Sequence, residues 1–183
     1  MTRPTLRSAL AATAMAVLLA APAAAQAPAN PVSDAVRASW NGVKKNMAAS
    51  ARSMSEANYA FRPTDKVRSF GEILAHVAGA NYVFCAPAKG EKSPFAEDHF
   101  EKTATTKMDI AKAVDDSIAY CDQAFAALTD ANAREMVAQA FGGGQAPRVA
   151  TLLGNIEHVA EHYGNLVTYF RLKGLVPPSS APQ

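Results

Sequence analysis

The chain has 183 residues, and its 18 Lys and Arg residues nearly balance its 16 Asp and Glu residues. Two of the basic residues, Arg3 and Arg7, lie in the N-terminal segment, so the remainder carries 16 charges of each sign. This balance does not favour binding to nucleic acid or to an acidic membrane surface, and the length suits a single domain.

The N-terminus has the layout of a secretory signal peptide. Two arginines precede an apolar run over residues 9–20, and small residues then lead to an A-x-A pattern that ends at Ala25. The apolar run is too short to span a bilayer comfortably, which disfavours the alternative of an uncleaved anchor helix. We expect cleavage after Ala25, a mature domain over residues 26–183, a secreted or periplasmic location, and no stable membrane insertion after cleavage.

Helical periodicity dominates the mature chain. From Ser33, a plausible N-cap, apolar residues follow the spacing of one helix face as far as Met54. The segment around Pro63 breaks this pattern. A second helix is predicted from Ser69, because "SFGE" forms a capping box in which Ser69 caps the helix and Glu72 reaches back.

A long polar segment, "APAKGEKSPFAEDHFEKTAT", then predicts a loop, and a third helix opens at Thr106 with Asp109 as its cap partner. The segment "AREMVAQAF" predicts a weaker helical piece, and "GGGQAP" predicts a flexible turn because it lacks the ending of a phosphate loop. A fourth helix is expected from Pro147 to about Lys173. No strand pattern competes, so the sequence predicts an all-α four-helix bundle whose long loop allows a crossover.

Two cysteines, Cys85 and Cys121, lie in the second and third predicted helices. An exported protein reaches an oxidising compartment, where this pair can form a disulfide. The alternative is two small buried apolar side chains. Helix geometry decides between them, because a disulfide needs the Cβ atoms to meet.

The stretch "NIEHVAEHYGNLVTYF" holds the strongest functional signal. His158 and His162 are four residues apart and flank the apolar stripe of the last helix, so both imidazoles can bind one metal ion. His76 borders the apolar stripe of the second helix in the same way. Three imidazoles with a fourth position left to water are typical of a catalytic metal site.

Each of these residues has a less specific interpretation. A lone histidine beside an apolar stripe is usually a hydrogen-bonded, partly buried residue, and His99 in the polar loop is expected to be solvated. The pentapeptide "HVAEH" also matches the H-x-x-E-H pattern of inverted zinc peptidases. That chemistry needs a further acidic ligand downstream, and no acidic residue follows Glu161.

Glu72 lies one turn before His76, so it is a candidate for a role beside the site. It could accept a hydrogen bond from the His76 ring or act as a base there. Its competing role is that of the capping box, which the sequence favours. Glu72 is therefore only a weak catalytic candidate, and the catalytic residues are otherwise not assigned.

Two segments, "YAFRPTDKVRSFGEILAHVAGAN" and "EHVAEHYGNLVTYFRLKGLVPPSS", resemble the DinB-like family of metal-binding helical bundles, in an exported form. The resemblance covers nearly the whole mature chain and rests on one histidine in the second helix and H-x-x-x-H in the last. It implies that His76, His158 and His162 bind a divalent ion such as zinc or nickel. It also implies an up-down-down-up bundle, often as a dimer.

Some cytosolic relatives in that family are thiol-dependent transferases or isomerases, but such thiols are chiefly cytosolic and this chain is expected to be exported. The sequence therefore predicts an exported metal-binding protein, either a metal-dependent hydrolase or transferase of an unknown small molecule, or a non-catalytic periplasmic metal-binding or structural protein. An open coordination position would favour catalysis, and a fourth protein ligand would favour a structural role.

Overall fold

The structure, a computed structural model, describes residues 29–182, so the predicted signal peptide lies outside the described residues. Four long helices form a bundle: α1 (Pro31–Ser53), α2 (Phe70–Lys89), α4 (Lys107–Ala127) and α5 (Arg148–Leu172). The smaller elements are η1 (Glu56–Asn58), α3 (His99–Thr103), β1 (Met136–Ala138), β2 (Gln145–Pro147) and η2 (Pro178–Ser180). None of the helices in the described part is both long and apolar enough to cross a membrane.

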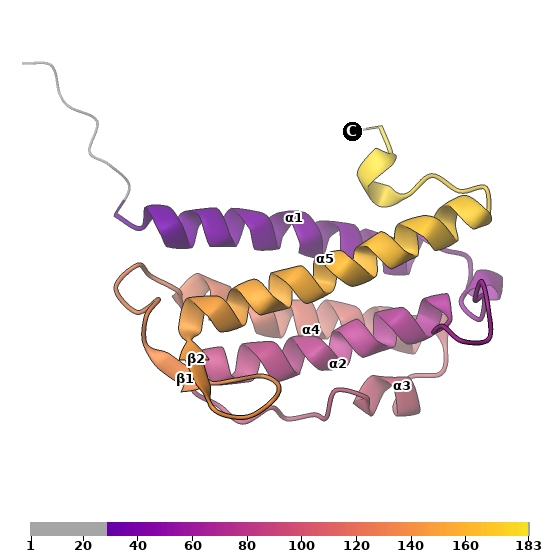
Figure 1. Cartoon of the computed structure of the whole chain (residues 1–183). Helices are drawn as coiled ribbons and strands as arrows, with labels where there is room; N and C mark the ends of the chain where they lie inside the picture. Colours follow the sequence, from indigo (N-terminus) through magenta and orange to yellow (C-terminus); the bar gives the residue numbers. More distant parts are fainter. Residues whose placement is uncertain (1–28, 183) are drawn as a thin grey trace, which may run out of the picture.

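The direction of each long helix follows from the residues that pair between helices. Asn81 donates a hydrogen bond to Ser117, and four residues later in each helix Cys85 forms a disulfide with Cys121. Helices α2 and α4 are therefore parallel. Pairs between α1 and α4 run in opposite order, namely Lys44 with Asp122 and Arg52 with Asp115, and Ser33 at the start of α1 pairs with Asp130 just beyond α4. Helix α5 runs opposite to α2. The predicted up-down-down-up order is confirmed, and the segment through α3 crosses back along the bundle (Figure 1).

Local capping signals set the starts of two helices as the sequence predicts. The Ser69 side chain accepts a hydrogen bond from the Glu72 backbone N–H, and the Glu72 carboxylate accepts one from the Ser69 backbone N–H. The Thr106 side chain likewise accepts from the Asp109 backbone N–H at the start of α4. These caps satisfy backbone donors that the first turn of a helix leaves unpaired.

The start of α1 differs from the prediction. The helix begins at Pro31, and Ser33 lies buried inside its first turn rather than at the N-cap. Proline is preorganised for the first helical position because its φ angle already suits the helix. The Ser33 backbone N–H and hydroxyl instead donate to the carboxylate of Asp130, which ties α1 to the chain beyond α4.

Two further segments differ from the predictions. The piece "AREMVAQAF" is not helical, since Met136–Ala138 pairs in antiparallel fashion with Gln145–Pro147. Gly142, Gly143 and Gly144 all have positive φ angles, which reverse the chain between the two strands. Helix α2 also continues past the predicted start of the loop to Lys89, and Gly90 ends it in the left-handed conformation.

A disulfide joins the two central parallel helices. Cys85 of α2 and Cys121 of α4 are both fully buried, and their Cα atoms are 5.3 Å apart. The disulfide that the sequence allowed between these two cysteines is thus confirmed. The bond lies inside the core, where Trp40 stacks on Phe125 with ring centroids 4.6 Å apart.

The crossover between α2 and α4 lies directly against α2 at Gly79. A Cβ atom at this glycine would come within 1.9 Å of the backbone oxygen of Glu97. Any other residue at position 79 would clash with this backbone, so the close packing of the crossover on α2 requires glycine here.

We expect Gly79→Ala to lower the free energy of unfolding by about 1–3 kcal/mol, because the new methyl group would push a backbone segment away. Urea denaturation monitored by circular dichroism measures this change. Gly42→Ala is the matched control, since nothing lies within 4 Å of a Cβ there and alanine favours a helix by about 1 kcal/mol. Equal behaviour of the two variants would contradict the prediction.

Candidate metal centre

Helix α5 presents His158 and His162 toward α2, one turn apart. Their Nε2 atoms are 3.1 Å apart, and both side chains are partly buried. The spacing of four residues places them on one face of the helix, as the sequence predicts. The neighbouring residues Val159 and Leu166 are buried in the core, and this packing sets the orientation of α5 about its axis.

The third histidine comes from α2. His76 is buried, and its Nε2 atom lies 3.1 Å from the Nε2 atom of His158. One nitrogen from each of His76, His158 and His162 lies within 4.8 Å of the other two. The structure therefore brings together all three histidines that the sequence selected.

The separations fit a shared cation. Zinc–nitrogen bonds of about 2.05 Å in tetrahedral geometry place two ligand nitrogens about 3.3 Å apart. Two of the nitrogen pairs are 3.1 Å apart, close to that value. Ring nitrogens aimed at one point repel one another through their lone pairs unless a proton or a cation lies between them. The donor set and its spacing thus fit a divalent metal ion.

A carboxylate behind His76 selects its tautomer. The Nδ1 atom of His76 lies 3.0 Å from Oε1 of Glu101, in the short helix α3. An Nδ1–H that donates to this carboxylate leaves the Nε2 lone pair free toward the other two histidines. Arg68 holds Glu101 in turn, with its Nε atom 2.9 Å from Oε2. This is the arrangement by which outer carboxylates orient histidine ligands of metals.

Glu72 does not take this role. Its carboxylate accepts from the Ser69 backbone N–H and pairs with Arg62, 2.8 Å away. Desolvation is the largest single effect and raises the pKa of Glu72, but these contacts together outweigh it, so the pKa is lowered. The carboxylate that contacts the His76 ring is that of Glu101, and the predicted capping role of Glu72 is confirmed.

His99 and Glu161 also lie outside the cluster. His99 starts α3 and stacks on Phe95 with ring centroids 4.5 Å apart, so it is half-buried rather than fully solvated. Glu161 is exposed and takes part in no hydrogen bond or ion pair within the described part of the chain. Its position gives no support to the inverted zinc-peptidase interpretation of "HVAEH".

Burial keeps the two α5 histidines neutral. Desolvation lowers the pKa of His158 to about 3, and the neighbouring His162 and His76 add to this effect. Desolvation also lowers the pKa of His162 to about 4, with His76 as the next cause. The Nδ1 atom of His158 is buried and has no hydrogen-bond partner within residues 29–182. Neutral imidazole is the form that binds a metal ion.

We expect the metal-free protein to lose stability as the pH falls below about 6.5. The unfolded chain binds protons on its histidines near that pH, whereas folded His158 and His162 resist protonation down to about pH 3 and 4. Stability is therefore complete above pH 6.5, and at pH 5 it should fall by about 1–2 kcal/mol per histidine.

Thermal unfolding in the presence of a chelator, between pH 7.5 and pH 5, measures this change. The double variant His158→Gln, His162→Gln should show a flatter pH dependence over the same range, and His99→Gln should behave like the wild type. A flat profile for the wild type would contradict the assignment of neutral buried histidines.

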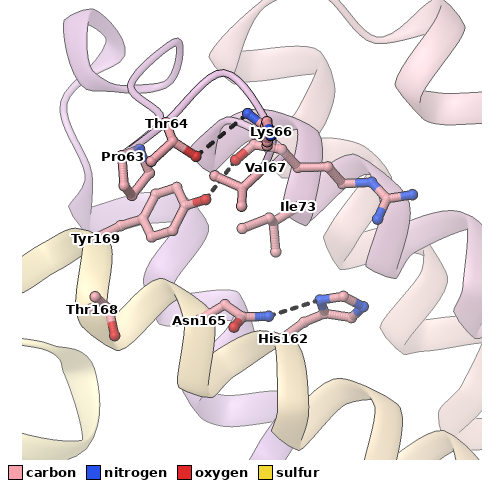
Figure 2. A pocket seen from close by; sticks show the side chains of 10 residues that line it. Pro63, Thr64, Lys66, Val67, Ile73, His162, Asn165, Thr168 and Tyr169 are labelled. Carbon is pink, nitrogen blue, oxygen red and sulfur yellow. Dashed lines mark hydrogen bonds between the residues drawn. The ribbon is translucent and has the colours of Figure 1, made fainter.

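A cavity opens next to His162. It has a volume of about 450 Å³ and lies between α5 and the segment that precedes α2. Figure 2 shows Asn165 and His162 on the α5 side, with Pro63, Thr64 and Val67 opposite. The Asn165 amide lies 3.4 Å from Nδ1 of His162 (Figure 2). Its amide oxygen can accept from an Nδ1–H if the amide is turned, because the two amide atoms are nearly indistinguishable.

The cavity is bordered by a fixed segment. The Tyr169 hydroxyl donates to the backbone oxygen of Arg68 at 2.6 Å. This bond holds the segment before α2 against α5. The volume is in the range of small-molecule sites, so the histidine cluster has a neighbouring space that a substrate could enter.

Two carboxylates near the cluster, those of Glu97 and Glu101, were not predicted from the sequence. Glu97 and Glu101 lie in the segment that was predicted to be a polar loop, four residues apart and next to Phe95 and Phe100. The sequence did contain one signal for them, namely two acidic residues four positions apart with aromatic residues nearby. Their distance from the histidines depends on how the crossover folds back, which periodicity alone does not show.

The fold and the histidine cluster together define a class of protein, the four-helix bundles with a three-histidine centre between α2 and α5. A family model described as the DinB superfamily matches residues 40–166. The chain belongs to the DinB superfamily, as the resemblance of its sequence segments predicted.

Solved structures share the fold at low sequence identity. A DinB-like protein from Bacillus cereus ATCC 10987 is 16% identical, with a TM-score of 0.62 over 79% of this chain and 95% of that one. A DinB-like protein from Bacillus subtilis is 18% identical, with a TM-score of 0.59 over 76% of this chain and 92% of the other. At these identities the likeness concerns the fold.

The mycothiol-dependent maleylpyruvate isomerase has the same TM-score of 0.62 at 15% identity. The match covers 73% of this chain but only 60% of the isomerase, so the isomerase has a substantial part without a counterpart here. A comparison with curated protein sequences gave no match.

Proposed function

We propose that this protein is an exported enzyme that binds one divalent metal ion through His76, His158 and His162 and carries out hydrolysis or group transfer on a small molecule. The convergence of the three ring nitrogens carries the proposal. Neutral imidazoles suit zinc, nickel or copper better than magnesium or calcium, and zinc or nickel is proposed here. When bound, the ion would supply a Lewis acid that polarises a substrate oxygen.

The surrounding residues have definite tasks in this proposal. Glu101 would hold the proton on Nδ1 of His76, which leaves the Nε2 lone pair free to bind the ion. The ring of Phe84 packs beside His158, with ring centroids 5.7 Å apart, and adds an apolar group next to the cluster. The cavity beside His162 would receive the substrate and present it to the ion from the open side.

Export is part of the proposal and has support from two directions. The N-terminal sequence has the pattern of a signal peptide. The disulfide between α2 and α4 suits an oxidising compartment, because thiols stay reduced in the cytosol. Fractionation of cells that produce the full chain, with N-terminal sequencing of the product, tests export and cleavage after Ala25.

The alternative, a non-catalytic metal-binding or structural protein, differs in its ligand set. It gains support from one contact, because the Glu97 carboxylate lies 3.6 Å from Nε2 of His76 and could fill a fourth position. The deciding experiment has two parts. Elemental analysis of the protein comprising residues 26–183 tests metal binding, and a screen of ester, amide and thiol-transfer substrates with and without chelator tests catalysis. Metal-free wild-type protein after incubation with zinc or nickel would overturn the proposed function.

A further inference from the structure

The crossover segment places Glu97 beside the face of His76 that points to the other histidines. Its Oε1 atom lies 3.6 Å from Nε2 of His76, whereas Glu101 contacts Nδ1 on the opposite edge of the ring. The two carboxylates therefore serve different edges of one imidazole. Only the Nε2 edge faces His158 and His162.

The position of Glu97 is built into the fold. Its backbone oxygen fills the space that a side chain at Gly79 would occupy, and Gly79 lies one turn after His76 on the same helix. On one side of Glu97, Phe95 packs on Tyr82 with ring centroids 4.9 Å apart. On the other side, Phe100 lies 5.9 Å from the same ring. The segment is held before and after Glu97, which keeps its carboxylate beside Nε2 of His76.

Glu97 has no Lys or Arg partner in the described part of the chain. Its one ion-pair contact within residues 29–182 is with His76, whereas the next residue, Asp98, pairs with Lys102. The Glu97 side chain is 39% exposed, and that of His76 is 7% exposed. A carboxylate that lies beside a ring nitrogen of the cluster, with no Lys or Arg partner among the described residues, is available to bind a cation there.

We propose that Glu97 is the fourth protein ligand of the metal ion, an inference that rests on the proposed binding of the ion by the three histidines. Neighbouring ligand atoms in a tetrahedral zinc site lie about 3.3 Å apart, and the Glu97 oxygen is 3.6 Å from Nε2 of His76. Glu97 is not among the side chains whose ligand atoms all lie within 4.8 Å of one another, so its carboxylate would turn toward His158 and His162 when it binds the ion. A carboxylate ligand also reduces the net charge of the site from +2 to +1.

This ligand is the exchangeable one. The histidines extend from two long helices of the core, whereas Glu97 lies in an irregular segment, and its side chain is 39% exposed against 7% for His76. Release of the Glu97 carboxylate would open one coordination position while the three histidines stay in place. A four-ligand resting site is therefore compatible with catalysis.

Cobalt(II) titration followed by visible absorption tests this proposal, because cobalt spectra report the ligand set without any enzyme assay. For Glu97→Gln we expect a shifted d–d band and a Kd raised at least about tenfold, the size typical even of losses outside the ligand shell. Asp98→Asn is the matched control, since it removes the same charge one residue later. It should keep the wild-type spectrum and Kd.

The outcomes separate this inference from the proposed function. If the wild type binds no cobalt or zinc, the proposed three-histidine centre fails and the Glu97 inference fails with it. If the wild type and Glu97→Gln share one spectrum and one Kd, only the fourth ligand is wrong. Gly79→Ala adds a second route, because displacement of the Glu97 backbone should produce the same spectral change while circular dichroism confirms that the bundle is folded.

Discussion

Alanine at any one of His76, His158 and His162 is expected to remove the metal ion from the protein. The three Nε2 atoms share one small volume, so each substitution takes away a neutral ligand that no nearby histidine can replace. Elemental analysis of each variant, after incubation with zinc and dialysis, measures the occupancy. We expect full occupancy in the wild type and near-zero occupancy in all three variants.

His99→Ala is the control for this prediction. The residue is also a histidine near the crossover, but it stacks on Phe95 and belongs to no cluster of possible ligands in the described part of the chain. It should keep wild-type occupancy. Full occupancy in His76→Ala would contradict the three-histidine centre and would leave the pair on α5 with a different partner.

The effect should extend to stability. An ion that binds only the folded protein stabilises it by about 4 kcal/mol when its free concentration is about 1,000 times Kd. The wild type should therefore melt at a higher temperature with zinc than with chelator, and the alanine variants should show no such difference. This comparison also detects a variant that has lost its fold rather than its ligand.

The orientation of His158 and His162 could be predicted because the geometry of a single helix determines it. Four residues make about one helical turn, so His158 and His162 had to face the same way once α5 was a helix. The starts of α2 and α4 were predictable for a similar reason, because Ser69 and Thr106 bond to backbone groups within three residues. Short-range contacts of this kind are visible in the sequence.

The role of Glu101 depends on a long-range contact. It is 25 residues from His76 in sequence, and the two meet only because the crossover folds back along α2. Gly79 permits that approach, but a glycine in a helical pattern has several possible explanations. Glu72, in contrast, was close to His76 in sequence and on the same helix face, which made it the visible candidate although its carboxylate is used in the cap and by Arg62.

The hairpin shows how a local pattern can be overridden. The segment that contains Met136 has helical spacing, but it is short and is followed by three glycines with positive φ angles. Pairing of Met136–Ala138 with Gln145–Pro147 then supplies backbone hydrogen bonds that a short isolated helix would hold only weakly. The hairpin leads directly into α5 and so precedes the helix that carries two of the ligands.

Loss of the disulfide is expected to produce the largest change in stability after loss of the metal. The bond between Cys85 and Cys121 closes a segment with a sequence separation of 36 residues. In the loop-entropy model a loop of this length corresponds to about 4 kcal/mol, which is a large part of the 5–15 kcal/mol typical of a folded domain. The crossover and α3 lie within this loop, so the unfolded chain gains much freedom when the bond is absent.

The double variant Cys85→Ala, Cys121→Ala should therefore unfold at lower urea than the oxidised wild type, by an amount that corresponds to about 4 kcal/mol. A reducing agent should shift the wild type toward the double variant and leave the variant itself unchanged. Alkylation of the unfolded, unreduced wild type should label neither cysteine, and labelling of both would contradict the bond.

Zinc should still stabilise the reduced protein, because the histidines link α2 to α5 whereas the disulfide links α2 to α4. If reduction also abolished zinc binding, the two links would be coupled through the position of α2, and the centre would depend on the oxidised state of the protein.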